Sequence, residues 1–172
     1  HSTPFDSFED AKDAICWLRS HASDYQLDPD KIAVAGGSAG GHLAAALGTI
    51  GSDEAVNYRP NLSVLYYPVV DMVSRGYGFP EIKRDFEKIS PIHHVSEATP
   101  STLILLGTKD PIVSVETIRS YQDKLLQKGV DCELHLFEGA GHPIFLYRKP
   151  LTEDYYKVRK LTDDFLKREG FL

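Results

Sequence analysis

The feature that most constrains the fold is a glycine-rich turn between an apolar run and a helical pattern. Residues 36–41 read Gly-Gly-Ser-Ala-Gly-Gly, and they directly follow the short apolar run 32–35. An uninterrupted apolar run of this length is typical of a strand covered on both faces. A helix is expected from residue 38 to residue 50, with Leu43 and Leu47 on one face. The segment therefore predicts a strand, a tight turn and a helix in immediate succession.

The rest of the chain repeats this alternation. Apolar residues at steps of three and four predict a helix over residues 8–22, opened by Asp6 and Glu9 in capping-box-like spacing. Strands are expected at 62–67, 102–106 and 132–137, and further helices at 115–125, ended by Gly129, and at 158–165, ending near Gly170. Strands that alternate with helices favour an α/β fold, a mostly parallel sheet with flanking helices.

An irregular excursion over residues 68–101 interrupts the pattern, with one short helix expected over 81–88. An insertion this long is more often functional than idle, so we expect it near the site. The remaining pattern shows no repeat or linker, which indicates one domain over residues 1–172.

Composition excludes several classes of protein. The chain has 19 Lys and Arg against 25 Asp and Glu, a net charge of −6, so clustered phosphate contacts to nucleic acid are not expected. No apolar run approaches the roughly 20 residues that span a membrane. Cys16 and Cys132 lie far apart without metal-ligand spacing, which favours buried free thiols. Localisation does not follow from these features.

The glycine-rich turn places a serine where chemistry is favoured. In the pattern G-x-S-x-G, a serine on a strained strand-to-helix turn projects its hydroxyl group away from the backbone. Small residues two positions before and after Ser38 are expected to prevent collisions with the strand and helix. The N–H of Ala39, at the start of the helix, would donate to an oxyanion. A plain glycine-rich turn is the alternative interpretation.

Other uses of a glycine-rich loop fail on spacing. No register of residues 36–41 supplies the glycine spacing of a dinucleotide fingerprint, and the Gly-Lys-Ser/Thr of a phosphate loop is absent. We therefore expect no cofactor, and no metal ion is required.

A serine nucleophile needs a base, and the base needs an acid that fixes its tautomer. Asp110 comes just after the strand at 102–106, and it is our candidate acid; a helix cap is its alternative role, and Asp71 is the second choice of acid. His142, in a glycine-containing loop after the last strand, is the candidate base, because it completes the chain order Ser, Asp, His.

The remaining histidines have simpler interpretations. His42 is expected to pack or hydrogen-bond one helical turn beyond Ser38, and His21 to sit near a helix end. His135 falls within a strand. His93 and His94 are adjacent, which does not suit two ligands on one helical face, so they are expected to be solvated or to line a pocket.

The chain resembles the α/β-hydrolase fold esterases, close to the group of acetyl xylan esterases and BD-FAE-like enzymes. The resemblance implies that Ser38 is the nucleophile, Asp110 the acid and His142 the base. The matching stretches follow the family's order and spacing: 4–5, 9–10, 17–18, 27–34, 37–44, 90–92, 107–113 and 141–142.

The sequence also departs from the pattern of this family. Family members carry an upstream His-Gly-Gly loop that supplies further oxyanion donors, together with the first strands of the sheet, and nothing before the first residue matches it. We expect an N-terminally incomplete α/β-hydrolase domain with reduced activity, whose exposed first strand pairs with another copy in a homo-oligomer.

Three functions remain open at this point. The first is hydrolysis of small acyl esters, such as acetyl esters of carbohydrates, through an acyl-enzyme. The second is a serine peptidase of the prolyl-oligopeptidase kind, although that kind usually has an aromatic residue where Ala39 follows Ser38. The third is a hydrolase fold that binds a ligand without turnover.

Overall fold

A four-stranded parallel sheet forms the centre of the protein. The computed structural model describes residues 3–51, 58–72, 85–144 and 151–172. The strands lie side by side in chain order and all run in the same direction. They are β1 (Ala33–Gly37), β2 (Leu62–Tyr66), β3 (Thr102–Gly107) and β4 (Cys132–Phe137). The predicted α/β fold with a parallel sheet and flanking helices is confirmed.

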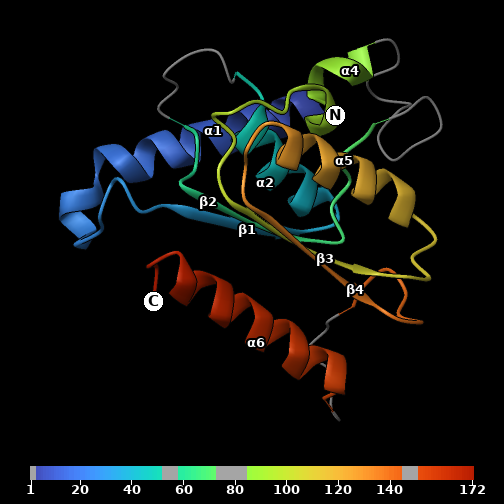
Figure 1. Cartoon of the computed structure of the whole chain (residues 1–172). Helices are drawn as coiled ribbons and strands as arrows, with labels where there is room; N and C mark the ends of the chain where they lie inside the picture. Colours follow the sequence, from blue (N-terminus) through green and yellow to red (C-terminus); the bar gives the residue numbers. More distant parts are fainter. Residues whose placement is uncertain (1–2, 52–57, 73–84, 145–150) are drawn as a thin grey trace.

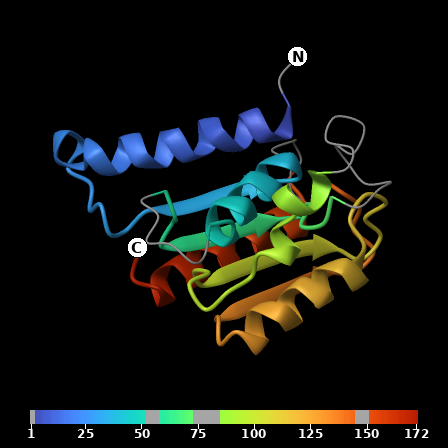
Figure 2. The ribbon, with the colours of Figure 1, turned by 90° about the horizontal axis from the view of Figure 1, so that it is seen from above.

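Helices cover both faces of this sheet. Figure 1 shows α1 (Pro4–Ser20), α2 (Ala39–Thr49) and α5 (Val115–Gln127) on one face and α6 (Glu153–Arg168) on the other. Figure 2, seen from above, shows α2 over the strands, α1 and α5 toward the two edges of the sheet, and α6 behind the strands. Three short helical segments complete the described elements: η1 (Ala22–Tyr25), α4 (Phe86–Ile89) and η3 (Pro91–His93).

The start of α1 differs from the expected cap. Thr3 is the N-cap: its side chain accepts from the N–H of Asp6, and the Asp6 carboxylate accepts from the N–H of Thr3 at 2.7 Å. The capping box therefore pairs Thr3 with Asp6, and the proposed pairing of Asp6 with Glu9 is wrong. Pro4 explains the difference, because a proline is favoured at the first helical position, where no N–H is needed.

Burial is greatest in the two central strands. Every residue of β3 is buried, and so is β2 from Leu62 to Leu65. By contrast β1 forms an edge of the described sheet, and Ala33 and Ala35 are exposed. The expectation that the first strand is covered on both faces is therefore wrong for the described residues. Small apolar side chains such as alanine are also found at exposed edge positions. The apolar run alone therefore could not separate an edge strand from a buried one.

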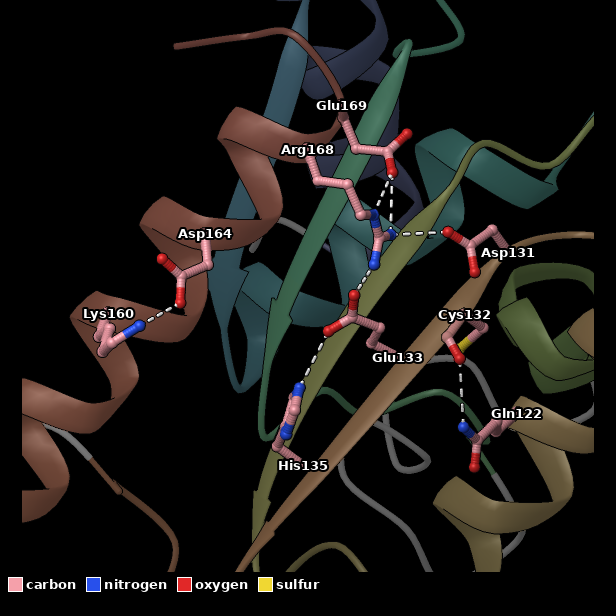
Figure 3. Close-up of polar contacts among 9 residues, drawn as sticks. All are labelled: Gln122, Asp131, Cys132, Glu133, His135, Lys160, Asp164, Arg168 and Glu169. Carbon is pink, nitrogen blue, oxygen red and sulfur yellow. Dashed lines mark hydrogen bonds and ion pairs between the residues drawn. The ribbon is translucent and has the colours of Figure 1, made fainter.

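The last helix packs on the sheet through Val158 and Phe165, which are both buried. Figure 3 shows a polar cluster at its C-terminal end, where Arg168 meets Asp131 at 2.6 Å and also contacts Glu133. Arg168 is 44% exposed, and ion pairs on a surface contribute about 0–1 kcal/mol each. The cluster therefore orients α6 on β4, while the buried apolar side chains hold it.

The excursion over residues 68–101 is described only in part, since residues 73–84 lie outside the described residues. The short helix expected over 81–88 corresponds to α4 over Phe86–Ile89. Its earlier positions cannot be compared. Cys16 and Cys132 are free, as predicted, but only Cys132 is buried. In the described part of the chain, no helix combines the length and apolar character needed to cross a membrane.

Candidate active site

Ser38 occupies a strained turn between β1 and α2. Its backbone has φ 56° and ψ −117°, a conformation that is strained for every residue except glycine. The Ser38 N–H donates to the carbonyl of Tyr66 at 3.0 Å, and α2 begins at Ala39. The predicted strand, turn and helix are therefore present. The N–H of Ala39 belongs to the first turn of α2, where backbone donors lack partners within the helix.

The glycines around this turn differ in what they allow. A Cβ added at Gly36 would lie 2.2 Å from the carbonyl oxygen of Gly40, so no other residue fits there. A Cβ at Gly41 would lie 2.9 Å from Pro68 Cα, whereas a Cβ at Gly40 would meet nothing within 4 Å. The expectation that only a small residue fits is confirmed at Gly36, two positions before Ser38. The same expectation is wrong at Gly40, two positions after Ser38, because α2 turns that position toward open space.

Asp110 lies in the turn that follows β3. Its Oδ1 accepts from the N–H groups of Ile112 and Val113, at 2.8 and 2.9 Å, which leaves Oδ2 free to face another group. The carboxylate is fully buried, with 0% of the side chain exposed. Asp110 thus organises its own turn and presents its other oxygen to the site. The alternative role as a helix cap is wrong, because Ser114 is the N-cap of α5.

His142 connects Asp110 to Ser38. Its Nδ1 lies 2.7 Å from Asp110 Oδ2, and its Nε2 lies 2.7 Å from Ser38 Oγ. A carboxylate can only accept, so Nδ1 donates its proton to Asp110. In a neutral imidazole Nε2 then carries no proton and accepts from the Ser38 hydroxyl group. The three predicted residues, distant in the sequence, form one continuous chain of hydrogen bonds.

The loops that carry these residues approach each other closely. The Lys109 N–H donates to the carbonyl of Ala140 at 2.9 Å, and the Gly139 N–H donates to Thr108 Oγ1 at 2.8 Å. A Cβ at Gly107 would lie 2.3 Å from the Ala140 carbonyl oxygen. The turn after β3 and the loop after β4 are therefore held together by backbone contacts and by the Thr108 side chain, which fixes the spacing between the carboxylate and the imidazole.

The other candidate acid lies elsewhere. Asp71 Oδ1 is 3.9 Å from His93 Nε2, and this oxygen has no hydrogen-bond partner in the described part of the chain. Burial raises the pKa of Asp71, and the nearby His93 and Lys124 offset part of that rise. Since Asp110 already contacts His142, Asp71 belongs to a separate cluster.

The remaining histidines match their simpler interpretations. His42 is buried, and its Nε2 donates to the carbonyl of Ile89 at 2.7 Å, which links α2 to the excursion. Burial lowers the pKa of His42, and this hydrogen bond partly opposes the change. His21 caps α1, and His135 lies in β4. His94 Nε2 bonds the carbonyl of Glu87 at 2.9 Å.

Tyr67 also lies at this site, although no sequence pattern singles it out. It follows β2 directly, has φ 39°, and is only 8% exposed. Its ring centroid is 4.8 Å from that of His142, with the ring planes at 62°. The sequence predicted Tyr67 as the last residue of the strand at 62–67, whereas β2 ends at Tyr66 and Tyr67 turns toward the site. Among the described residues, no group of three or more His, Cys, Asp or Glu side chains is arranged to hold a metal ion.

Comparison with known proteins identifies relatives along nearly the whole chain. The chain is 31% identical over 146 residues to the probable carboxylic ester hydrolase LipM of Mycobacterium tuberculosis, an alignment that covers 71% of this chain and 34% of the relative. It is 27% identical over 157 residues to the acetylxylan esterase of Xylanibacter ruminicola, with coverage of 80% and 32%. The chain thus spans about a third of the length of these curated relatives.

A solved structure agrees with the fold described above. Esterase 2 of Thermogutta terrifontis, in a form phosphoramylated by tabun, matches with a TM-score of 0.90 and 36% identity over 100% of this chain and 68% of that chain. The resemblance to α/β-hydrolase esterases is therefore confirmed. The prolyl oligopeptidase family matches residues 8–169, and the chain belongs to that family, with the fold of an α/β-hydrolase.

Proposed function

We propose that the protein is a serine hydrolase that cleaves small acyl esters, acetyl esters first among them. One observation carries the proposal: Ser38 Oγ, the two ring nitrogens of His142 and Asp110 Oδ2 form a continuous chain with both contacts at 2.7 Å. This arrangement gives the serine a base and gives the base an oriented partner, which are the two requirements of a serine nucleophile.

In the first half of the reaction, Ser38 Oγ attacks the ester carbonyl while Nε2 of His142 accepts the hydroxyl proton. The imidazolium keeps its Nδ1 proton on the bond to Asp110, so the buried carboxylate stabilises the positive charge. The N–H of Ala39 donates to the oxyanion at the positive end of α2. Nε2 then returns the proton to the leaving alcohol, and an acyl group remains on Ser38.

In the second half, a water molecule takes the place of the alcohol. Nε2 of His142 accepts one water proton as the water oxygen attacks the acyl carbonyl, and the same proton returns to Ser38 Oγ when the acid leaves. The sum is an ester plus water giving an acid plus an alcohol. The chain's own residues move every proton in this scheme, and no cofactor takes part.

The proposed substrate class rests on the relatives. One is named as an acetylxylan esterase, and the esterase of Thermogutta terrifontis was also solved with propionate and with butyrate bound. Those carboxylates have the size of the acyl group that a small-acyl esterase releases. We therefore propose short acyl chains, and acetylated carbohydrate as one source of them.

The test is to measure chromogenic acetate hydrolysis and labelling by a fluorophosphonate for the protein and its Ser38→Ala variant. Ser20→Ala is the matched control, because Ser20 is an exposed serine at the end of α1. We expect Ser38→Ala to lose both turnover and labelling and the control to keep both. Unlabelled Ser38 in a folded protein, or turnover that survives Ser38→Ala, contradicts the proposal. Acetate release from acetylated xylo-oligosaccharides tests the carbohydrate substrate.

A serine peptidase is the second candidate function. The family match and the 30% identity over 159 residues to the acylamino-acid-releasing enzyme of Arabidopsis thaliana favour it, with coverage of 79% of this chain and 20% of that relative. Turnover of a chromogenic proline amide that exceeds turnover of the acetate would support the peptidase. A hydrolase fold that only binds its ligand is the third candidate, and an acyl-enzyme seen by intact mass would exclude it.

A further inference from the structure

Two of the strained residues in the protein are neighbours at the carboxyl edge of the sheet. Among the described residues other than glycine, only Gln26, Ser38 and Tyr67 have positive φ. Gln26 ends a short 3-10 helix on the surface. Ser38 and Tyr67 each follow a strand, and these two strands are paired in register. Strain of this kind persists where the surrounding structure enforces it, and it concentrates at functional sites.

The backbone of Tyr67 is fixed on both sides. Its N–H donates to the carbonyl of Leu105 in β3 at 2.7 Å. On the other side, the carbonyl of the preceding residue, Tyr66, accepts from the N–H of Ser38. The strained turn at Tyr67 is therefore attached to the strained turn at Ser38 and to the strand that leads to Asp110. This attachment gives the direction of the Tyr67 side chain little freedom.

The side chain of Tyr67 extends from the serine turn to the imidazole. A Cβ at Gly37 would lie 2.8 Å from the Tyr67 hydroxyl oxygen, so the phenol end lies over the residue before Ser38. The ring meets the ring of His142 at a centroid distance of 4.8 Å. Burial raises the pKa of the Tyr67 hydroxyl group, as do the nearby Tyr66 and Asp110, so the group stays neutral at neutral pH.

The orientation of the His142 imidazole requires a restraint that the Tyr67 ring provides. The hydrogen bonds of the His142 loop fix where the backbone of the loop lies, but they do not themselves restrict rotation of the imidazole about its side-chain bonds. The hydrogen bonds to Asp110 and Ser38 both lie near the plane of the ring, which leaves rotation about the line between the two partners. A buried aromatic ring packed against the imidazole opposes that rotation.

We propose that Tyr67 is a positioning residue that holds the His142 imidazole in line with Ser38 through the packing of its ring. This inference rests on the proposed serine hydrolase function. The ring contacts the imidazole that accepts the Ser38 proton, so we expect its loss to act on proton transfer. The effect therefore falls on kcat with little change in KM.

The experiment compares Tyr67→Leu with Tyr67→Phe. The leucine variant removes the ring and is expected to lower kcat roughly threefold to tenfold, the worth of one edge-to-face aromatic pair. The phenylalanine variant keeps the ring and is expected to retain the activity of the unmodified protein. Tyr58→Leu is the matched control, since it removes an edge-to-face ring pair with Phe8 and a hydrogen bond to the Ile50 carbonyl at 3.0 Å, both away from the site. We expect this control to lower thermal stability and to leave kcat unchanged.

A second readout does not depend on turnover. The Nδ1 proton of His142 that bonds Asp110 is observable by NMR as a downfield resonance, and we expect Tyr67→Leu to broaden it and Tyr67→Phe to keep it. A leucine variant with unchanged kcat and an unchanged resonance overturns the inference, and so does a phenylalanine variant as impaired as the leucine one. If instead Ser38→Ala keeps ester turnover, the proposed function fails, and the NMR comparison still decides whether Tyr67 orients the imidazole.

Discussion

Replacement of Asp110 by asparagine is the sharpest test of the site, because every contact of this carboxylate is an accepted hydrogen bond. Oδ1 accepts from the N–H groups of Ile112 and Val113, and Oδ2 accepts from Nδ1 of His142. An asparagine offers one accepting oxygen and one donating NH2 group, so it cannot satisfy both sides. The single accepting oxygen of the asparagine can therefore serve either the N–H groups of the turn or Nδ1 of His142, but not both.

The asparagine amide can point its oxygen toward its own turn or toward the imidazole. The two orientations differ in energy because only the first keeps the hydrogen bonds from the N–H groups of Ile112 and Val113. With its oxygen on the turn, the amide donates to Nδ1, which forces the proton onto Nε2 and leaves Ser38 without a base. With its oxygen on the imidazole, the NH2 group faces two N–H donors, and each donor left unsatisfied costs about 1–3 kcal/mol. The productive orientation is therefore disfavoured by about 2–6 kcal/mol, which is a loss of roughly 30-fold to 10⁴-fold in kcat/KM.

The assay is chromogenic acetate hydrolysis by Asp110→Asn, with thermal unfolding measured on the same sample. Loss of charge from the bonds to the turn costs about 1–2 kcal/mol, so the Tm falls by about 2–8 °C and the variant stays folded at 25 °C. Asp131→Asn is the control, because Asp131 is an exposed aspartate at the α6 contact. A folded Asp110→Asn variant whose kcat/KM stays within about threefold of the unmodified protein would refute this reasoning, since the predicted loss begins at roughly 30-fold.

Three further predictions concern the turn, the buried histidine and the sheet edge. Gly36→Ala is expected to prevent folding, because its Cβ would lie 2.2 Å from a backbone oxygen, while Gly40→Ala melts like the unmodified protein; equal melting temperatures would contradict the steric argument. Since the pKa of His42 is lowered by burial, its contribution to stability is complete above about pH 6.5 and declines as the pH falls through the folded-state pKa. Urea unfolding from about pH 7.5 to about pH 5 should show this decline, and His42→Gln should flatten it; an unchanged slope argues against the assignment. We also expect the exposed β1 edge to pair with a second copy, and sedimentation at the mass of a single chain would exclude this pairing.

Much of the site could be predicted because local patterns specify it. The strand, turn and helix around Ser38 follow from a short segment, and parallel strands bring their carboxyl ends to one edge of the sheet. Positions of Asp110 and His142 after later strands were therefore enough to predict that they lie near the serine. Their distances of 2.7 Å depend on the contacts between their loops, which the sequence does not display.

Features that depend on backbone direction or on distant contacts were missed. Thr3 and Asp6 have the same spacing as Asp6 and Glu9, and only the preference of Pro4 for the first helical position separates the two caps. Gly40 tolerates a side chain because of the direction in which α2 leaves the turn. Tyr67 contacts His142 across a long separation in sequence, and its positive φ is visible only in the folded chain.

The relative positions of Ser38, Asp110 and His142 depend on the hydrogen bonds between neighbouring strands of the sheet. The first residue after each of the first three strands donates to the neighbouring strand: Ser38 to the last carbonyl of β2, Tyr67 to Leu105 of β3, and Thr108 to the last carbonyl of β4. Each loop therefore starts from a point that the register fixes. A slip of one residue moves a strand end by about 3.3 Å, which is more than a 2.7 Å hydrogen bond can absorb. The hydrogen bonds from Ser38 to Asp110 consequently exist only in the native register, so substitutions that weaken the sheet without shifting its register should lower stability and leave the geometry of the surviving folded molecules intact.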